Sequence, residues 1–205
     1  MARFKNTKNE LKAQRDALRR YERYLPTLQL KKQQLQLEVR LVEHRLEENV
    51  TAERLAVESV ANWVGLFGES IDFGRWLAVE RLVLDETNVA GVTIPVLRDV
   101  EFTRSMPDLF ATDPWLDDAL DVLSSLARLR LQRRILERQR ELLSAELVIT
   151  NQRVNLFERV KIPECKEVIR RVRIFLGDMQ TLDVARGKIA KRKALERETA
   201  SCSHR

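Results

Sequence analysis

Apolar residues in the N-terminal third of the chain recur with a seven-residue period. Two interleaved registers, three residues apart, make up the pattern: Leu11, Leu18, Leu25, Val39 and Leu46 in one, and Tyr21, Leu28, Leu35 and Val42 in the other. A heptad with two apolar positions is the sequence form of a coiled-coil seam. The pattern therefore predicts a long helix that packs along one face against a second helix.

Local signals indicate where this first helix begins and ends. The sequence Thr7-Lys8-Asn9-Glu10 is a capping box, which predicts a start near residue 8. Gly65 and Gly68 are stop signals, so we expect the helix to cover residues 8–64.

Pro26 lies inside this predicted helix. A proline in a helix interior removes one hydrogen bond and bends the axis. A complete break would put Leu28 and Leu35 out of phase with the apolar residues before Pro26. They remain in phase, so we favour a kink.

A second helical arm is predicted over residues 113–198. Asp113 is a suitable N-cap and Pro114 suits the first helical position. Two heptad registers again appear: Leu129, Leu136, Leu143 and Phe157 in one, and Leu126, Leu147, Val154, Val168, Phe175, Leu182 and Ile189 in the other. This seam is less regular, because polar residues occupy three of its positions: Arg133, Arg140 and Lys161. Pro163 is a second candidate for a kink.

The segment between the arms, residues 67–111, has a different period. Residues 79–84 and 92–102 are rich in β-branched residues and partly alternate, and residues 85–88 together with Gly91 offer turn chemistry. These features predict a short β-hairpin. Trp63, Trp76 and Trp115 lie in or beside the segment, which favours a small packed head. Either a partner-docking surface or a simple cap on the hairpin end is consistent with that head.

Together these elements predict a mainly α fold. We expect a single elongated domain, residues 1–205, formed by a long antiparallel coiled-coil helical hairpin with a small central β-hairpin head. Such a hairpin brings the two ends of the chain to one tip.

Charge is distributed unevenly along the 205 residues, whose formal net charge is +6. Residues 1–32 hold ten Lys or Arg against three acids, and residues 186–205 hold seven against two. Residues 69–121 hold four Arg against twelve acids. Surface charge often serves only solubility. Basic residues at both ends of the sequence nevertheless favour a basic tip that meets an acidic surface, with an acidic head at the turn.

The sequence contains no recognisable catalytic chemistry. We find no phosphate-binding glycine loop, no dinucleotide fingerprint and no zinc or nucleophile-elbow motif. No catalytic, cofactor-binding or metal-binding residue is therefore assigned, and no cofactor is expected. Cys165 and Cys202 do not form a disulfide framework, and His44 is expected on a solvated helix face. With no apolar run long enough for a membrane span and no signal-peptide core, a cytoplasmic location is the default expectation.

Several segments resemble one protein family. The stretch 151–158, Asn-Gln-Arg-Val-Asn-Leu-Phe-Glu, followed by Ile162-Pro163, resembles the C-terminal helix signature of the D subunit of V-type (A/V-type) ATP synthases. Further segments look like the bacterial branch of that family: residues 7–11, 24–28, 30–35, 91–96, 113–115, 183–186 and 188–191. The chain departs from the family at Asn6-Thr7-Lys8, where Pro-Thr-Arg is common, at Gln152, where a second Arg is common, and at Phe157.

The resemblance implies a central-stalk rotor shaft without a catalytic site of its own. Both helical termini would lie inside the ring of catalytic A and nucleotide-binding B subunits. The other end would meet the F subunit of the stalk and the membrane-rotor adaptor, known as the C or d subunit. Proton translocation through the membrane ring would then be coupled to ATP synthesis or hydrolysis, with the chain peripheral on the cytoplasmic side of the plasma membrane. Pro26 and Pro163 would supply the bend that makes such a shaft asymmetric.

Three other functions remain as alternatives. A coiled-coil scaffold or tether without a motor would self-associate through the seam. A nucleic-acid binder is suggested by the sequence pI of about 9.6, but basic residues are not interleaved with aromatic ones, and we expect no nucleic-acid partner. A membrane-surface helix is disfavoured because the basic residues do not border a continuous apolar stripe.

Overall fold

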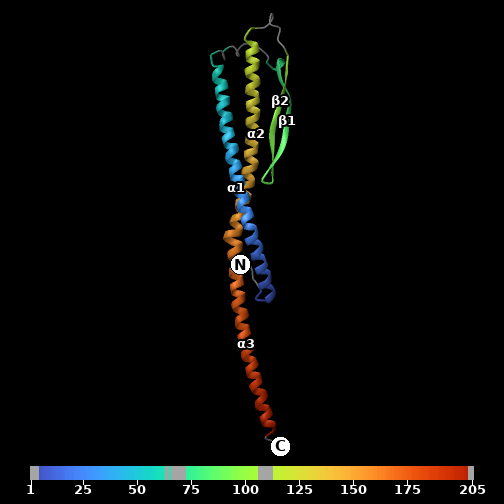
Figure 1. Cartoon of the computed structure of the whole chain (residues 1–205), viewed down its shortest axis with the longest axis vertical. Helices are drawn as coiled ribbons and strands as arrows, with labels where there is room; N and C mark the ends of the chain where they lie inside the picture. Colours follow the sequence, from blue (N-terminus) through green and yellow to red (C-terminus); the bar gives the residue numbers. More distant parts are fainter. Residues whose placement is uncertain (1–4, 63–64, 66–72, 106–112, 203–205) are drawn as a thin grey trace. The chain divides into compact units, whose positions relative to one another are not determined.

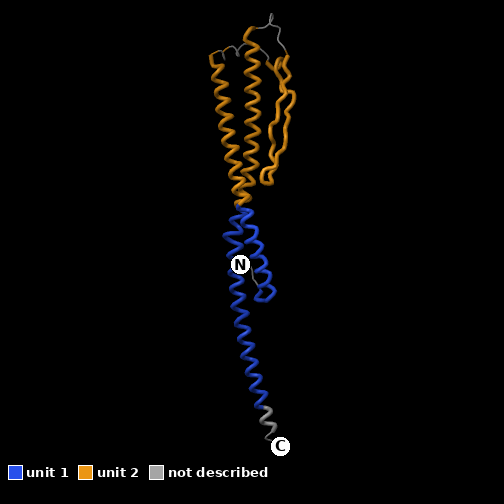
Figure 2. Tube along the Cα trace, in the orientation of Figure 1, with its two compact units in different colours: residues 1–29, 152–205 blue, residues 30–151 orange. Residues whose placement is uncertain are grey.

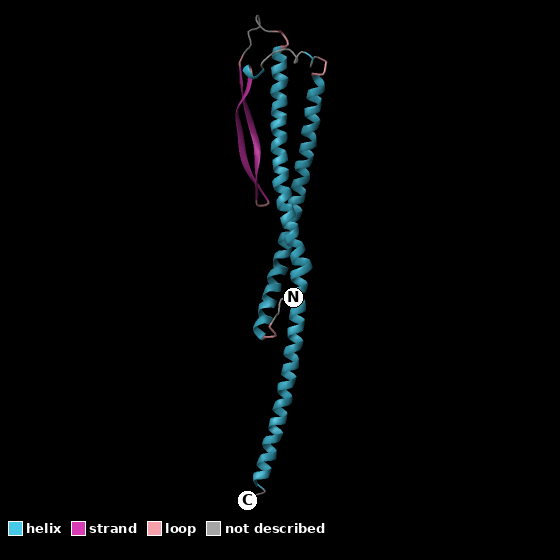
Figure 3. Cartoon of the chain, turned by 180° about the vertical axis from the view of Figure 1, so that it is seen from behind, coloured by secondary structure: helices cyan, strands magenta, loops and turns pink. Residues whose placement is uncertain are grey.

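The computed structural model describes residues 5–62, 65, 73–105 and 113–202, with side chains described as far as residue 196. Helices dominate this part of the chain, and one antiparallel pair of strands separates them (Figures 1 and 3). The mainly α fold, an antiparallel coiled-coil helical hairpin with a β-hairpin between its arms, is confirmed. Trp63, one of the three tryptophans expected around the head, lies outside the described residues.

The first helix, α1, covers Lys8–Ser59. Its start is as predicted, and the Glu10 backbone N–H donates to Thr7 Oγ1 at 3.2 Å, which satisfies one free N–H of the first turn. Its end comes earlier than predicted. Val60 and Ala61 donate to carbonyls three residues back, at 3.2 Å each, so the helix tightens into a turn before the glycines are reached.

The α1 helix continues through Pro26, so a break at this residue is excluded. The kink stays a prediction. The apolar registers extend beyond the residues first recognised. Asn49, Ala56 and Val60 continue the alternating three- and four-residue spacing, and all three are buried or half-buried. The seam of the first arm is therefore confirmed along most of α1.

The second arm consists of α2, Leu116–Asn155, the π-helix η3, Leu156–Lys161, and α3, Ile162–Cys202. The arm starts three residues later than the predicted N-cap, because Asp113, Pro114 and Trp115 form a turn in which the Asp113 carbonyl accepts the Leu116 N–H at 3.1 Å.

The π-helix ends two residues before Pro163. The Ile162 N–H donates to the Phe157 carbonyl, five residues back, instead of the usual four. In an α-helix the ring of Pro163 would clash with the carbonyl of Arg159. The wider π-helical turn moves that carbonyl away, so the distortion expected at Pro163 lies in the six residues that precede Ile162.

The extra residue in this turn shifts the seam by one position. Leu136, Leu143 and Thr150 are buried at seven-residue intervals, and the same register would predict residue 157 and then residue 164. Cys165 and Val172 are buried instead, one residue later. Val168 is buried as predicted. The positions further along that register are exposed, so their predicted place in an intramolecular seam is wrong: Phe175 at 41%, Leu182 at 49% and Ile189 at 49%.

The β-hairpin is longer than predicted. Strands β1, Leu77–Val89, and β2, Val92–Arg104, are antiparallel, so residues 85–88, expected in the turn, belong to β1. The turn is Ala90-Gly91, with φ of 51° and 83°. Two consecutive positive φ values match the right-handed twist of a hairpin. The Gly91 N–H donates to Asn88 Oδ1 at 3.0 Å, which secures the turn. A short 3₁₀ helix, η2, Phe73–Arg75, precedes the hairpin.

The chain divides into two compact units, residues 1–29 with 152–205, and residues 30–151 (Figure 2). Both terminal segments belong to the first unit, where the rings of Tyr21 and Phe157 are 5.0 Å apart. The second unit contains the main apolar cluster, drawn from α1, the hairpin and α2: Leu35, Val39, Val42, Ile94, Leu136 and Leu143.

Candidate functional site

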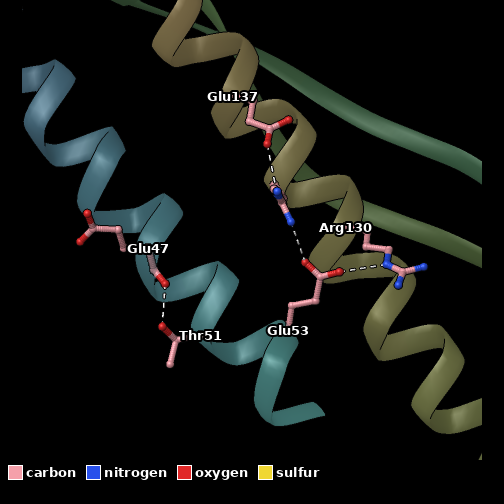
Figure 4. Close-up of polar contacts among 6 residues, drawn as sticks. Glu47, Thr51, Glu53, Arg130 and Glu137 are labelled. Carbon is pink, nitrogen blue, oxygen red and sulfur yellow. Dashed lines mark hydrogen bonds and ion pairs between the residues drawn. The ribbon is translucent and has the colours of Figure 1, made fainter. Parts of the chain in front are cut away.

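A continuous network of charged side chains joins α1 to α2 in the second unit (Figure 4). Glu53 accepts hydrogen bonds from Arg130 Nε at 3.0 Å and from Arg133 Nη1 at 3.3 Å. Arg133 Nε also donates to Glu137 at 3.1 Å. Glu53 stands one heptad after Leu46, and only 16% of its side chain is exposed. At this position an ionic link therefore replaces an apolar seam contact.

The arginines hold the carboxyl group of Glu53 in its charged form. The hydrogen bond from Arg130 lowers the Glu53 pKa below its ordinary value of 4.5, against the opposing effect of burial, and Arg133 lowers it further. The pKa of Arg133 is raised, first by its hydrogen bond to Glu137 and then by Glu53. The ionised network is thus the form that the fold stabilises.

This pKa shift predicts how stability depends on pH. Because the folded-state pKa of Glu53 is lowered, its contribution is complete above the unfolded pKa and disappears as pH falls below about 4.5 through the folded pKa. We expect Glu53→Gln to lower the free energy of unfolding by roughly 1 kcal/mol at pH 7. Wild type should lose this advantage over the variant between about pH 5 and the acid limit.

Urea unfolding at a series of pH values measures this difference. Glu47→Gln is the control, because Glu47 lies on α1 near the network and its carboxylate contacts none of the network residues (Figure 4). An advantage of wild type over Glu53→Gln that stays constant down to about pH 2.5 would contradict the assignment.

A second ion pair links the arms nearer the other end of the same unit. Lys31 Nζ lies 2.7 Å from Glu146 Oε1, and both side chains are partly buried. Lys31 precedes Glu53 on α1, whereas Glu146 follows Arg130 and Arg133 on α2, as an antiparallel pair requires. The apolar cluster lies between the two links in sequence on both arms. Sliding one arm along the other would break both links together.

Polar groups also occur among the buried residues, two of them at seam positions and the third, Gln139, beneath the hairpin. Asn49, Gln139 and Thr150 are at most 5% exposed. Asn49 Oδ1, Gln139 Oε1 and Thr150 Oγ1 are buried without a hydrogen-bond partner. Unpaired buried oxygens reduce stability, whereas a polar residue at a seam position restricts the register of a coiled coil. Asn49 and Thr150, which occupy seam positions, therefore favour one alignment of the arms at a cost in stability.

In the first unit, the outer half of α3 presents an apolar stripe to solvent. From Arg173 to Glu196 no side chain is buried. Four exposed apolar residues of this segment follow heptad spacing: Phe175, Met179, Leu182 and Ile189. We call these four residues the α3 stripe. After Leu182, the same segment contains five basic residues: Arg186, Lys188, Lys191, Arg192 and Lys193.

The first of the segments that carry the family resemblance falls on a structural junction. Residues 151–158 cover the end of α2 and the first half of the π-helix. Phe157, a departure from the family pattern, contacts Tyr21 and therefore has a packing role in this chain. His44 is solvated, as expected, and pairs with Glu48 at 3.4 Å. Cys165 is a free, buried thiol whose pKa is raised by burial.

The ionic link at Glu53 was missed by the sequence reasoning. The signal was present, because Glu53 continues one apolar register of the first arm and Arg133 interrupts the second arm. Opposite charges at seam positions of two antiparallel helices are able to pair across the interface. To predict from the sequence which charged residues pair, one must know how the two arms are aligned, and the heptad pattern alone does not specify this alignment.

Neither a membrane span nor a metal centre is found in the part of the chain that the structure describes. Its helices lack an apolar stretch of the length needed to cross a bilayer. No group of three or more His, Cys, Asp or Glu side chains among the same residues is placed to hold a metal ion.

Comparisons with known proteins point to a single family. Residues 10–192 match the sequence profile of the family described as the D subunit of ATP synthase. The V-type ATP synthase D subunit of Borreliella burgdorferi is 41% identical over 201 residues, which cover 98% of this chain and the whole of that protein. Its counterpart in Chlamydia caviae is 30% identical, with 97% of each chain covered, and that of Chlamydia trachomatis serovar L2 is 33% identical, with 93% and 95% covered. The chain belongs to the family of V-type ATP synthase D subunits.

Proposed function

We propose that this chain is the central-stalk rotor shaft of a V/A-type rotary ATP synthase or ATPase. As a shaft it has no catalytic site of its own and couples proton translocation through the membrane ring to ATP synthesis or hydrolysis in the catalytic ring. The observation that carries the proposal is the α3 stripe, an exposed apolar heptad that continues beyond the packed part of the first unit. The rotary complex in this proposal is the one named by the family to which the chain belongs.

The two units of the chain meet different partners in this proposal. The first unit, with its α3 stripe and basic residues, enters the ring of A and B subunits. The second unit meets the F subunit of the stalk and the membrane-rotor adaptor, the C or d subunit. The chain is then peripheral to the membrane, on its cytoplasmic side, and reaches the membrane only through the complex.

The coupling mechanism follows from the asymmetry of such a shaft. The α3 stripe is apolar on one side of the helix, so a ring of three catalytic interfaces meets three different surfaces at any instant. Each interface shifts toward its open or closed form according to the surface that it contacts, because a ligand changes a conformational equilibrium only by binding the two states differently. Rotation of the shaft then moves these preferences from one catalytic site to the next.

Reconstitution with purified A and B subunits tests the proposal. We expect one copy of the chain per three A–B pairs by native mass spectrometry, and ATP hydrolysis that depends on the chain. Deleting residues 1–12 and 186–205 should abolish both, since these segments contain basic residues of the proposed tip. Circular dichroism and thermal unfolding of the truncated chain control for loss of fold. Self-association of the full chain, without a complex from folded components, would instead favour the coiled-coil scaffold.

A further inference from the structure

The side of α1 that faces away from the second arm carries another heptad pattern, within the second unit. Leu37 lies two residues after the fully buried Leu35, which places it about 200° around the helix. Two registers run along this side: Leu30, Leu37, His44 and Thr51 in one, and Gln34, Leu41, Glu48 and Leu55 in the other. We call these eight residues the outer α1 stripe. All eight are exposed, and the exposed fraction of its four leucines lies between 42% and 59%.

A hollow in this stripe has the form of a coiled-coil hole. Its volume is about 400 Å³, and its lining includes His44, Glu47, Glu48 and Thr51 of α1. In a coiled coil each apolar knob inserts into a hole formed by four residues of the facing helix. These four residues have the spacing of such a hole, so the outer α1 stripe is shaped to receive a second helix.

The charged residues beside the stripe indicate which helix this is. Arg40 and Glu47 flank the stripe on one side, and Glu38 and Arg45 flank it on the other. None of the four makes an ion pair within the part of the chain that the structure describes. Figure 4 shows the Glu47 carboxylate pointing away from α2. Each side thus carries one unpaired positive and one unpaired negative charge, seven residues apart and in opposite order.

This arrangement is complementary to itself when two copies of α1 run antiparallel. Arg40 of each copy then faces Glu47 of the second copy, and Glu38 faces Arg45 of the second copy, because flanking positions of the same kind meet in an antiparallel pair. Every such contact occurs twice through the two-fold symmetry. A parallel pair would instead bring Arg40 against Arg45 of the second copy, and like charges repel.

The same alignment also matches the apolar residues. With the two-fold axis between residues 42 and 43, Leu30 packs beside Leu55 of the second copy, and Leu37 enters the hollow of the second copy. A shift of one heptad in one direction would place Glu47 against Glu47 of the second copy. A shift in the other direction would place Arg40 against its own counterpart. One antiparallel alignment therefore satisfies both the charges and the leucines.

We propose that this chain forms a homodimer when it is outside the assembled complex, through antiparallel pairing of the outer α1 stripes of two copies. The interface lies on the side of α1 opposite the intramolecular seam, so each copy keeps its fold. Polar residues occupy half of the stripe and its flanking ion pairs are exposed, which makes the dimer weak and reversible. The proposal does not depend on the rotor function, and it is tested without A and B subunits, so the failure of one proposal leaves the other standing.

Charge reversal tests the pairing, with the association constant of the full chain measured by sedimentation equilibrium. We expect Arg40→Glu and Glu47→Arg each to weaken self-association about tenfold, because each turns an attraction into a repulsion at two symmetric positions. An equimolar mixture of the two variants should associate about as strongly as wild type, since opposite charges then meet at both positions. Glu43→Arg is the matched control: it makes the same change at an exposed residue of α1 outside the stripe.

Two further controls keep the result specific. The α3 stripe is another apolar surface, so the series is repeated with Phe175, Leu182 and Ile189 replaced by Gln, where the effects of the charge reversals should be unchanged. Circular dichroism of each variant checks the fold, and restored association in the mixture shows that both variants are folded. A wild-type chain that stays monomeric up to high micromolar concentration would overturn the proposal. So would a dimer that neither reversal weakens, or one that mixing does not restore.

Discussion

Replacing Leu35 by Ala should lower the free energy of unfolding by about 3–5 kcal/mol, the range measured when a fully buried leucine is truncated and its cavity does not collapse. Leu35 is 0% exposed and belongs to the apolar cluster of the second unit, where helices from both arms meet Ile94 of the hairpin. The neighbours on three elements are held by other contacts, so they cannot all move in to fill the space. Urea unfolding followed by circular dichroism measures the loss.

Leu37→Ala is the matched control for this experiment. Leu37 is on the same helix, two residues away, and is 59% exposed. The same chemical change should alter the free energy of unfolding by less than about 0.5 kcal/mol. Similar losses in the two variants would mean that the side of α1 facing the second arm has been assigned wrongly.

Replacing Phe175, Leu182 and Ile189 together by Gln should reduce ATP hydrolysis of the reconstituted complex by at least about tenfold. In the proposed function these three exposed apolar side chains become buried in a partner, where they supply on the order of 1.5–3 kcal/mol each. Their loss would therefore remove most of that proposed contact. The isolated chain should keep its thermal stability, because each of these residues is at least 41% exposed in it.

Val184→Gln and Ile174→Gln are the controls for the α3 stripe. Both residues lie off the stripe on the same helix, at 59% and 57% exposure. The coupling mechanism requires that one side of the helix matters more than the other, so this double variant should retain most of the activity. Equal loss in the two sets of variants would rule out a directional surface. Full activity in the triple variant would remove the α3 stripe from the proposed interface.

The apolar period predicted the two arms well because a coiled-coil seam is a local repetition that any stretch of the sequence reveals. The start of α1 was equally local, since the Thr7 side chain bonds the Glu10 N–H three residues away. The hairpin was predicted in outline but too short. Residues 85–88 have turn-forming side chains, yet the positive φ values fall on Ala90 and Gly91. The position of this turn determines which residues of β1 and β2 pair.

What the sequence did not reveal depends on contacts between distant segments. Proline at position 163 signalled a distortion, but not that six preceding residues would adopt a π-helix. The exposure of the α3 stripe depends on how far along α3 the first arm supplies a partner, which a seven-residue period does not specify. The ion pairs of Glu53 and Lys31 could be predicted only if the alignment of the two arms were known. No site residues had been predicted, and the contact surfaces proposed here appeared only once burial was known.

The π-helical turn at Leu156–Lys161 has a practical consequence for exchanging segments between relatives. The heptad register of the second arm changes at this turn, so that α2 follows one register and α3 another. A chimera that joins α2 of one relative to α3 of another keeps both faces correctly oriented only when the donor and the recipient carry the same number of residues in this turn. A difference of one residue would rotate everything beyond the junction by about 100° about the helix axis. Length within this turn is therefore more constrained than residue identity, and insertions or deletions should be tolerated far better in the loops than here.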